Sequence, residues 1–349
     1  LSGSPGTADP AAGQGPATSL NIADFRVASG DLLISGAVKE RASDIHVEPF
    51  ERDVRVRYRI DGVLYEKFAV PKSQQAAIIS RVKIMANLNI AERRSPQDGR
   101  FQMKMENREV DIRVSVIPML HGEAVVMRLL RQNATLRGLR ELDMDTRERE
   151  CFQRVLDLPH GIVLVTGPTG SGKTTTLYSV LNHINTEGIH IMTLEDPVEY
   201  PMALVRQTSV AETSKLDFAN GIRSMMRQDP DVILVGEIRD AETAEMAFRA
   251  AMTGHQVYST LHTNSAIGTI PRLLDIGVLP DIMAGNIIGI VAQRLIRRLC
   301  DHCKSPYHAE THEMQLFGTP ADGTRPVLYR ATGCERCDFQ GYRGRIAIM

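Results

Sequence analysis

The sequence predicts an α/β protein in which a doubly wound parallel sheet is joined to a smaller α+β domain. Two observations favour this fold class. Short apolar runs alternate with helical segments in the second half of the chain, and segments with a period of two dominate residues 30–130. The chain has 349 residues, more than one hydrophobic core usually supports, so two domains are expected.

The composition is that of an ordinary globular protein. Hydrophobic residues make up 43% of the chain and charged residues 24%, and the formal net charge is −1. A net charge near zero offers no general attraction for a polyanion, and without tryptophan few stacking platforms for bases exist, so we expect no nucleic acid partner. No apolar run approaches the roughly 18 residues of a spanning helix, so no integral membrane segment is expected.

Residues 1–29 are rich in Gly, Ala, Pro and Ser at their start and are expected to form a flexible linker. They lack the charged start and apolar stretch of a signal peptide. The chain begins with Leu1 rather than Met and stops directly after a strand-like segment at 345–348, so we expect both ends to be cuts in a longer protein.

The smaller domain is expected over residues 30–130. Valines and arginines alternate along 54–60, which predicts a half-buried strand with arginines on its open face, and Asp61-Gly62 predicts a hairpin turn. The expected elements are a helix at 32–39, strands at 54–60 and 63–65, a helix at 74–88, and strands at 101–105, 109–116 and 124–130.

The larger domain is expected over residues 131–349, after a polar connector. Its apolar runs are short and continuous, as in parallel strands that are covered on both faces. The predicted strands are 162–166, 189–194, 232–235 and 257–261, and the predicted helices are 173–184, 217–227 and 241–252.

A glycine-rich segment follows the first of these strands and opens the first helix, which is the context of a phosphate-binding loop (P-loop). Glycines let main-chain N–H groups approach phosphate oxygens, and the helix N-terminus adds its positive end. Lys173 would reach the β and γ phosphates, and Thr174 would hold Mg²⁺. An ordinary glycine-rich turn is the alternative. The predicted nucleotide-binding residues are Gly167, Pro168, Thr169, Gly170, Ser171, Gly172, Lys173, Thr174 and Thr175.

Three other predicted strands also end in acids or a histidine. Glu237 follows one of them, Glu195 and Glu199 follow another, and His262 follows the third. Because the carboxyl ends of parallel strands face the ligand crevice, these groups are candidates to orient the attacking water and to sense the γ phosphate. The alternative for each is a structural or surface role.

Two Cys-x2-Cys pairs, Cys300/Cys303 and Cys334/Cys337, lie in a polar segment at about 298–340 with little apolar content. Four thiolates suit tetrahedral, structural Zn²⁺, although the gap between the pairs is longer than usual. Disulfides are the competing interpretation, but a P-loop protein belongs in a reducing cytosol, where paired cysteines more often bind metal. The nearby His302, His308 and His312 remain alternative ligands. Cys151 stands apart and is expected to be buried.

These motifs together resemble the type II secretion/type IV pilus ATPase family over nearly the whole chain after the linker. In carrying the four cysteines, the chain resembles the assembly and secretion motors of this family, whereas its pilus-retraction motors lack them. The resemblance therefore favours extension or secretion over retraction. The matching segments are the P-loop (Walker A), Glu-Asp-Pro-Val-Glu at 195–199 (Asp box), Gly-Glu-Ile-Arg-Asp at 236–240 (Walker B), Thr-Leu-His-Thr at 260–263 (His box), Ala-Ser-Asp-Ile-His-Val-Glu at 42–48 and Pro-Gln-Asp-Gly-Arg at 96–100.

The resemblance implies a RecA-like motor domain joined to a PAS-like domain, assembled as homo-hexamers that hydrolyse ATP. It implies Glu199 as the general base with Glu195 as second candidate, and places His262 near the γ phosphate. Glu237 would act through Mg²⁺ and water. Arg100 and Arg113 of the smaller domain are expected to approach the phosphates, with a solvated strand face as the alternative.

The implied setting is cytoplasmic and peripheral to the bacterial inner membrane, with platform and docking proteins of a pilus or secretion machine as partners. The motifs leave open whether the chain serves pilus assembly or type II secretion. Two other functions compete with the motor: a RecA-like nucleic-acid translocase, and a nucleotide-dependent interaction module without turnover.

Overall fold

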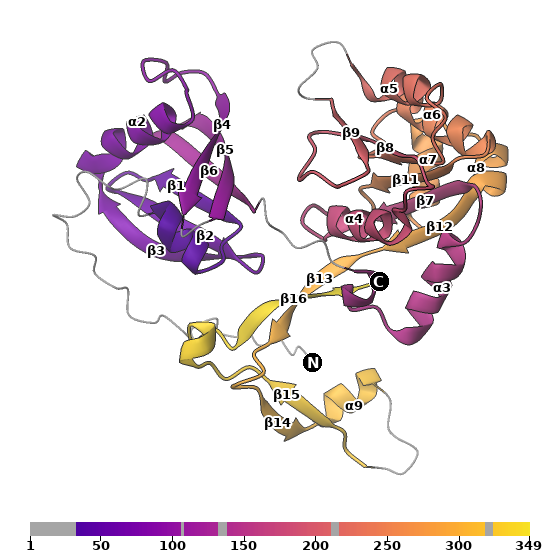
Figure 1. Cartoon of the computed structure of the whole chain (residues 1–349). Helices are drawn as coiled ribbons and strands as arrows, with labels where there is room; N and C mark the ends of the chain where they lie inside the picture. Colours follow the sequence, from indigo (N-terminus) through magenta and orange to yellow (C-terminus); the bar gives the residue numbers. More distant parts are fainter. Residues whose placement is uncertain (1–32, 106–107, 132–137, 211–215, 318–323) are drawn as a thin grey trace, which may run out of the picture. The chain divides into compact units, whose positions relative to one another are not determined.

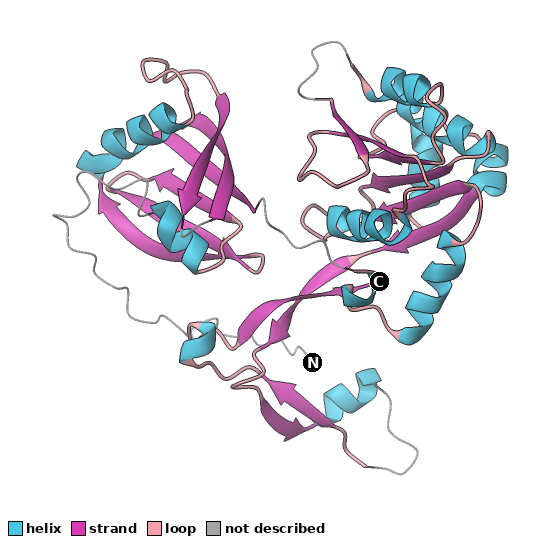
Figure 2. Cartoon of the chain, in the orientation of Figure 1, coloured by secondary structure: helices cyan, strands magenta, loops and turns pink. Residues whose placement is uncertain are grey.

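The structure is a computed structural model that describes residues 33–105, 108–131, 138–210, 216–317 and 324–349 (Figure 1). The predicted linker at 1–29 lies outside these residues. The chain divides into two compact units. One unit comprises Leu1–Arg131 and Arg297–Arg345, and the other comprises Gln132–Ile296 and Ile346–Met349. Each unit contains its own large sheet (Figure 2).

The sheet of the first unit has six strands, and all its neighbouring pairs are antiparallel. Its spatial order is β3-β2-β1-β6-β5-β4. The predicted strands are present, but several are longer than predicted, and β1 was not predicted as a strand. The strands are β1 (Asp44–Pro49), β2 (Asp53–Ile60), β3 (Val63–Pro71), β4 (Gln97–Met105), β5 (Arg108–Met119) and β6 (Gly122–Arg131).

Alternation along these strands produces one buried face. Val110, Ile112, Val114 and Val116 of β5 are all buried, as predicted, in a core that also includes Tyr58. The helical residues 33–39 and helix α2 (Gln75–Met85) add apolar side chains to this core. The opposite face carries charged side chains, because residues with the other parity along each strand point there.

A buried ion pair lies at the edge of this core. The Lys83 side chain is 1% exposed and the Glu123 side chain 9% exposed. Lys83 Nζ donates to Glu123 Oε1 at 2.5 Å and to the main-chain oxygen of Glu92 at 2.6 Å. Both charges are therefore buried, and the loss of either one would leave the other buried without a partner of opposite charge.

The second unit contains the predicted parallel sheet, with six strands in the order β12-β7-β11-β10-β8-β9. The α/β class with a parallel sheet is therefore confirmed. Its strands are β7 (Gly161–Thr166), β8 (Ile191–Glu195), β9 (Arg206–Ser209), β10 (Val232–Val235), β11 (Gln256–Leu261) and β12 (Ile287–Ala292). Its helices are α3 (Thr146–Leu156), α4 (Lys173–Ile184), α5 (Phe218–Met225), α6 (Ala241–Met252), α7 (Thr269–Ile276) and α8 (Pro280–Asn286).

Helices cover both faces of this sheet, which makes it doubly wound. Ile162 and Leu164 of β7 pack in a core with α5, α6, α7 and α8. Val163 and Val165 of the same strand pack in a second core with α3 and α4. Figure 1 shows these two groups of helices on opposite sides of the sheet. The continuous apolar character of β7 thus follows from burial on both faces.

The remaining elements form two small two-stranded sheets. Strand β13 (Arg294–Leu299) pairs with β16 (Tyr342–Ile348), and β14 (Ser305–His308) pairs with β15 (Val327–Arg330). Helix α9 (Thr311–Phe317) and the 3₁₀ turn η3 (Glu335–Cys337) complete this region. Within the described part of the chain, no helix has the length and apolar character to cross a membrane.

Candidate functional site

The carboxyl ends of four neighbouring strands meet at one edge of the parallel sheet. Thr166 at the end of β7 lies opposite Leu261 at the end of β11, and Val235 at the end of β10 lies opposite Leu194 of β8. The P-loop, His262, Glu237 and Glu195 follow or terminate these strands. The structure therefore brings the four predicted motifs of the larger domain to the same edge, where open α/β sheets bind ligands.

The P-loop needs its glycines for two physical reasons. Gly170 has a φ of +77° and Gly172 a φ of +89°, and residues with a side chain rarely adopt such values. A Cβ on Gly167 would lie 2.3 Å from the main-chain oxygen of Gln293, and a Cβ on Gly172 would lie 2.8 Å from Nε2 of Gln293. The loop therefore runs against Gln293, and α4 begins directly after it at Lys173.

Gln293 was not predicted as a site residue. It is 3% exposed, and its Oε1 accepts a hydrogen bond of 2.6 Å from Thr176 Oγ1 on α4. Its position could have been found, because it ends the apolar run 287–292, which forms strand β12 beside β7. In the sequence, that run was considered only as an apolar segment that is too short to span a membrane. Its role as a strand was missed.

Lys173 folds back over the P-loop. Its Nζ donates to the main-chain oxygen of Gly167 at 2.8 Å and to that of Pro168 at 3.3 Å. Burial lowers the pKa of Lys173, while the Glu237 carboxylate acts in the opposite direction. The ammonium is thus held by carbonyl oxygens at the loop, where a phosphate could replace them.

Glu237 and His262 lie beside this ammonium. Nδ1 of His262 is 3.5 Å from Lys173 Nζ, and Nε2 of His262 is 3.5 Å from Glu237 Oε2. The other oxygen of Glu237 pairs with Arg239. Glu237 follows β10 and His262 follows β11, so two predicted residues from different parts of the sheet lie close to the P-loop lysine.

Threonine hydroxyls fasten the segment that carries His262. Oγ1 of Thr166 and Oγ1 of Thr263 share a hydrogen bond of 2.6 Å, and the main-chain N–H of Thr263 donates to Thr166 Oγ1 at 2.9 Å. Thr263 Oγ1 also lies 3.0 Å from Thr269 Oγ1 at the start of α7. Thr166 is the last residue of β7, so the His262 segment is tied directly to the strand that leads into the P-loop.

Glu195 and Glu199 occupy different environments. Glu195 is 4% exposed and accepts hydrogen bonds from Tyr178 and, at 2.5 Å, from Thr193. Burial raises the pKa of Glu195, and its hydrogen-bond donors act in the opposite direction. Glu199 is half-buried in the segment 196–205, and its main-chain N–H donates to Tyr178 Oη at 3.3 Å.

Tyr178, which contacts both acids, and Gln207, which contacts Glu195 and Tyr178, were missed by sequence reasoning. Tyr178 lies inside the apolar repeat of α4 and reads as a core residue, while Gln207 lies on the short edge strand β9, which was not predicted. Nothing in either residue's sequence context distinguishes it from an ordinary structural position.

Arg100 and Arg113 belong to the unit that does not contain the P-loop. They lie directly opposite each other on β4 and β5, and Arg128 of β6 lies opposite Arg113. Arg128 Nε pairs with Asp44 Oδ1 at 3.0 Å. Three guanidinium groups thus follow one another across three neighbouring strands.

The four predicted cysteine ligands form a compact cluster. All their sulfur atoms lie within 4.8 Å of one another, and the cluster contains no histidine among the described residues. The Sγ–Sγ distance is 4.0 Å for Cys300 and Cys334, 3.7 Å for Cys303 and Cys337, and 3.8 Å for Cys334 and Cys337. A tetrahedral metal at about 2.3 Å from each sulfur requires edges of about 3.8 Å, so the cluster fits a metal.

These distances also weigh against disulfides. A disulfide bond joins its sulfur atoms at about 2.05 Å, so the observed separations are those of free thiols or metal ligands. The main-chain N–H groups of Gly333 and Gly341 donate to Cys303 Sγ at 3.3 Å and Cys337 Sγ at 3.2 Å. Such donors stabilise thiolates, which are the form that binds metal.

The prediction that Cys151 is buried is wrong. Cys151 is exposed on α3, and Arg154 Nη2 donates to its sulfur at 3.6 Å. Helix α3 buries Phe152 and Leu156 instead, which are four residues apart and share one face. Cys151 precedes that face by one residue and points away from the core.

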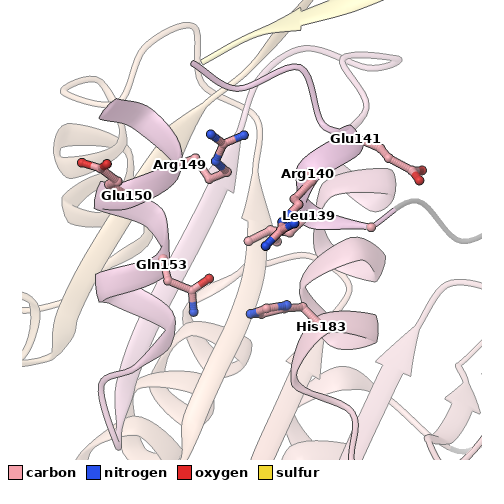
Figure 3. A pocket seen from close by; sticks show the side chains of 8 residues that line it. Leu139, Arg140, Glu141, Arg149, Glu150, Gln153 and His183 are labelled. Carbon is pink, nitrogen blue, oxygen red and sulfur yellow. The ribbon is translucent and has the colours of Figure 1, made fainter. Parts of the chain in front are cut away.

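A cavity of about 600 Å³ lies away from the P-loop, at the other end of α4 (Figure 3). Arg140 and Arg149 point into it, and Gln153 faces His183 across it. It contains none of the predicted site residues. The P-loop, Glu195, Glu237 and His262 therefore lie at the edge of the sheet and not in this cavity.

The sheet and the P-loop at its edge define the class, which is that of P-loop α/β proteins. The family model described as "Type II/IV secretion system protein" matches residues 26–349. The chain belongs to this family, and the resemblance seen in the motifs is confirmed.

Individual relatives show which members of this family the chain resembles. The chain is 49% identical over 316 residues to "Type II secretion system ATPase E" of Vibrio cholerae, covering 90% of the chain and 63% of that protein. It is 51% identical over 324 residues to "Type IV pilus assembly ATPase PilB" of Myxococcus xanthus, covering 91% of the chain and 57% of that protein. The solved structure of the pilus retraction motor PilT with bound ADP is 31% identical, with a TM-score of 0.56, over 85% of this chain and 80% of that one.

The chain thus spans less than two thirds of the length of these two curated relatives. The relatives are named as ATPases of secretion and of pilus assembly, and the chain resembles both kinds to a similar degree. Their names therefore agree with the two machines that the motifs left open, without a preference for either.

Proposed function

We propose that this protein hydrolyses ATP as a subunit of a homo-hexameric ring that powers type IV pilus assembly or type II protein secretion. The observation that carries the proposal is the convergence of Lys173, His262 and Glu237 at the P-loop, in a chain that belongs to the secretion-system family. In this proposal residues 131–349 form a RecA-like motor domain and residues 30–130 a PAS-like domain.

The P-loop would bind the phosphates of ATP through main-chain N–H groups and Lys173, which would exchange its carbonyl partners for phosphate oxygens. Thr174, exposed at the start of α4, and Glu237, through water, would hold Mg²⁺. The ion would neutralise charge on the β and γ phosphates. His262 would contact the γ phosphate from its position beside Lys173.

Glu199 is the proposed general base. It would take a proton from the water that attacks the γ phosphorus, as the bond to the ADP oxygen breaks and phosphate leaves. Glu195 is the less suitable candidate, since it is 4% exposed and occupied by Tyr178 and Thr193. The half-buried Glu199 has more access to water.

Arg100 and Arg113 would approach the phosphates of a bound nucleotide when the domains close. The register of β4 and β5 places the two side chains on one face of the sheet, from which both could reach the same nucleotide. Hydrolysis would then depend on domain closure, which would couple chemistry to movement.

The cysteine cluster would hold one structural Zn²⁺ within a subdomain at about 298–340. Four thiolates leave no open coordination position, so the ion would stabilise the fold and not act on substrate. In this proposal the ring would act in the cytoplasm at the inner membrane through platform and docking proteins.

Phosphate release by the purified protein with Mg²⁺ and ATP tests the proposal. We expect turnover in the parent and loss of nucleotide binding in Lys173→Ala, because the ammonium charge at the phosphates is lost. Glu199→Gln should bind ATP without normal turnover. A parent that binds ATP without turnover would support an interaction module instead, and turnover that depends on DNA would support a nucleic-acid translocase.

A further inference from the structure

Two side chains fix the main chain of the segment 196–205, which carries Glu199. The N–H of Glu199 donates to Tyr178 Oη at 3.3 Å. Gln207 accepts from the N–H of Met202 at 2.7 Å through Oε1 and donates to the main-chain oxygen of Tyr200 at 3.2 Å through Nε2. Tyr178 and Gln207 thus hold this segment at three positions.

Tyr178 connects the segment to the P-loop helix. It is 1% exposed and lies on α4, which begins at Lys173. Its ring packs edge-to-face against Tyr200, with 4.6 Å between the ring centroids. Gln207 Nε2 also donates to Tyr178 Oη at 3.4 Å. The helix that starts at the phosphate site therefore carries the group that holds the acidic segment.

Glu195 sets the direction of the Tyr178 hydroxyl. Thr193, Gln207 and Tyr178 all donate hydrogen bonds to the carboxyl group of Glu195. The Tyr178 hydrogen must therefore point at Glu195. The oxygen lone pairs then face the N–H of Glu199 and the amide of Gln207.

We infer that Tyr178, oriented by Glu195, is a positioning residue that holds Glu199 in place for proton abstraction. This inference rests on the proposed function and deepens it. It gives Glu195 a role as an anchor and not as a second base. A misplacement of a catalytic group by about 1 Å can cost about 10²-fold in rate, so removal of one hydroxyl should be visible in kcat.

Tyr178→Phe is the direct test, because it removes the hydroxyl and keeps the ring in the core. In phosphate-release assays of the purified protein we expect kcat to fall by about 10- to 100-fold, with the KM for ATP unchanged. Gln207→Leu should act in the same direction, since it frees the segment at Tyr200 and Met202 while Tyr178 remains.

Tyr258→Phe is the matched control. Tyr258 is also 1% exposed and belongs to the same core, but its hydroxyl donates to Gln256 Oε1 at 3.1 Å, at the opposite end of β11 from His262. It should lose stability like Tyr178→Phe and keep the parental kcat. Equal kcat values for Tyr178→Phe and Tyr258→Phe would overturn the inference.

A second background separates positioning from a general loss of structure. If Tyr178 acts through Glu199, Tyr178→Phe should slow single-turnover hydrolysis in the parent and cause no further loss in Glu199→Gln. Equal loss in both backgrounds would contradict the inference and leave the proposed function intact. A parent without Mg²⁺-dependent turnover would overturn both. A fully active Glu199→Gln would overturn the inference and the assignment of Glu199 as general base, and would leave ATP hydrolysis itself intact.

Discussion

Nδ1 of His262 lies 3.5 Å from Nζ of Lys173, which places an imidazole directly beside the P-loop ammonium. The same ring reaches Glu237 through Nε2. A group in this position can stabilise charge that develops on the γ phosphate, and removal of such a group typically costs about 10²- to 10³-fold in kcat.

We therefore expect His262→Ala to lower kcat by about 10²-fold, with ATP affinity retained because Lys173 remains. Steady-state phosphate release and binding of a fluorescent ATP analogue measure the two quantities. His255→Ala is the control, since His255 precedes β11 where His262 follows it. Parental turnover in His262→Ala would refute its role.

Gln293→Leu should destabilise the parallel-sheet unit. Thr176 is fully buried, and its hydroxyl donates to Gln293 Oε1. A buried hydroxyl without a partner costs about 1–3 kcal/mol, which urea unfolding can measure. Gln293→Leu combined with Thr176→Val should lose less than the sum of the two single changes, because no orphan hydroxyl remains. Additive losses would show that the hydrogen bond contributes little.

Elemental analysis should find one zinc per chain in the parent and none in Cys337→Ser, because a structural site needs all four thiolates. Removal of zinc with a chelator should make the subdomain at 298–340 sensitive to protease, since two small two-stranded sheets have little core. Cys151→Ser is the matched control. This variant should still contain one zinc per chain, because Cys151 lies on α3 and is not part of the cysteine cluster. A parent protein free of zinc would contradict the prediction.

Lys83→Met should destabilise the smaller sheet unit by about 3–5 kcal/mol, because it leaves the Glu123 carboxylate buried and unpaired. Lys83→Met combined with Glu123→Leu should recover most of this loss in urea unfolding, since no buried charge remains. If the double variant is as unstable as Lys83→Met alone, the hydrogen bond from Lys83 Nζ to the main-chain oxygen of Glu92 matters more than the ion pair.

Arg100→Gln should lower kcat strongly and change nucleotide affinity little, if Arg100 acts on the transition state. Removal of an arginine that stabilises phosphoryl transfer costs about 10³-fold or more. Arg55→Gln is the control, because Arg55 is an arginine of the same sheet that pairs with Glu66. A similar small effect of both changes would assign Arg100 to a solvated strand face.

The sequence predicted the parallel sheet well because its signals are local and strong. Helices α4 and α6 begin and end at the predicted residues, and the glycine-rich loop fixes one end of the sheet. Strands β9, β14 and β15 were not predicted, since none of their four residues is buried, whereas the equally short β10 is a continuous buried apolar run. Strand β12 of the parallel sheet was missed as well. The convergence of the cysteine pairs followed from spacing alone.

The finer organisation of the site could not be predicted. The network of Tyr178, Glu195 and Gln207 joins residues from α4, β8 and β9, and no local pattern links them. Cys151 was misplaced for a related reason: a lone cysteine has no periodic partner that assigns it to a helix face. Both cases depend on tertiary contacts.

The hydroxyls of Thr166, Thr263 and Thr269 mean that the main chain next to the imidazole that follows β11 is fixed once, when the chain folds. Its conformational search is then complete before any nucleotide arrives. In the proposed cycle, each turnover would begin without the delay and entropy loss of arranging that segment of main chain.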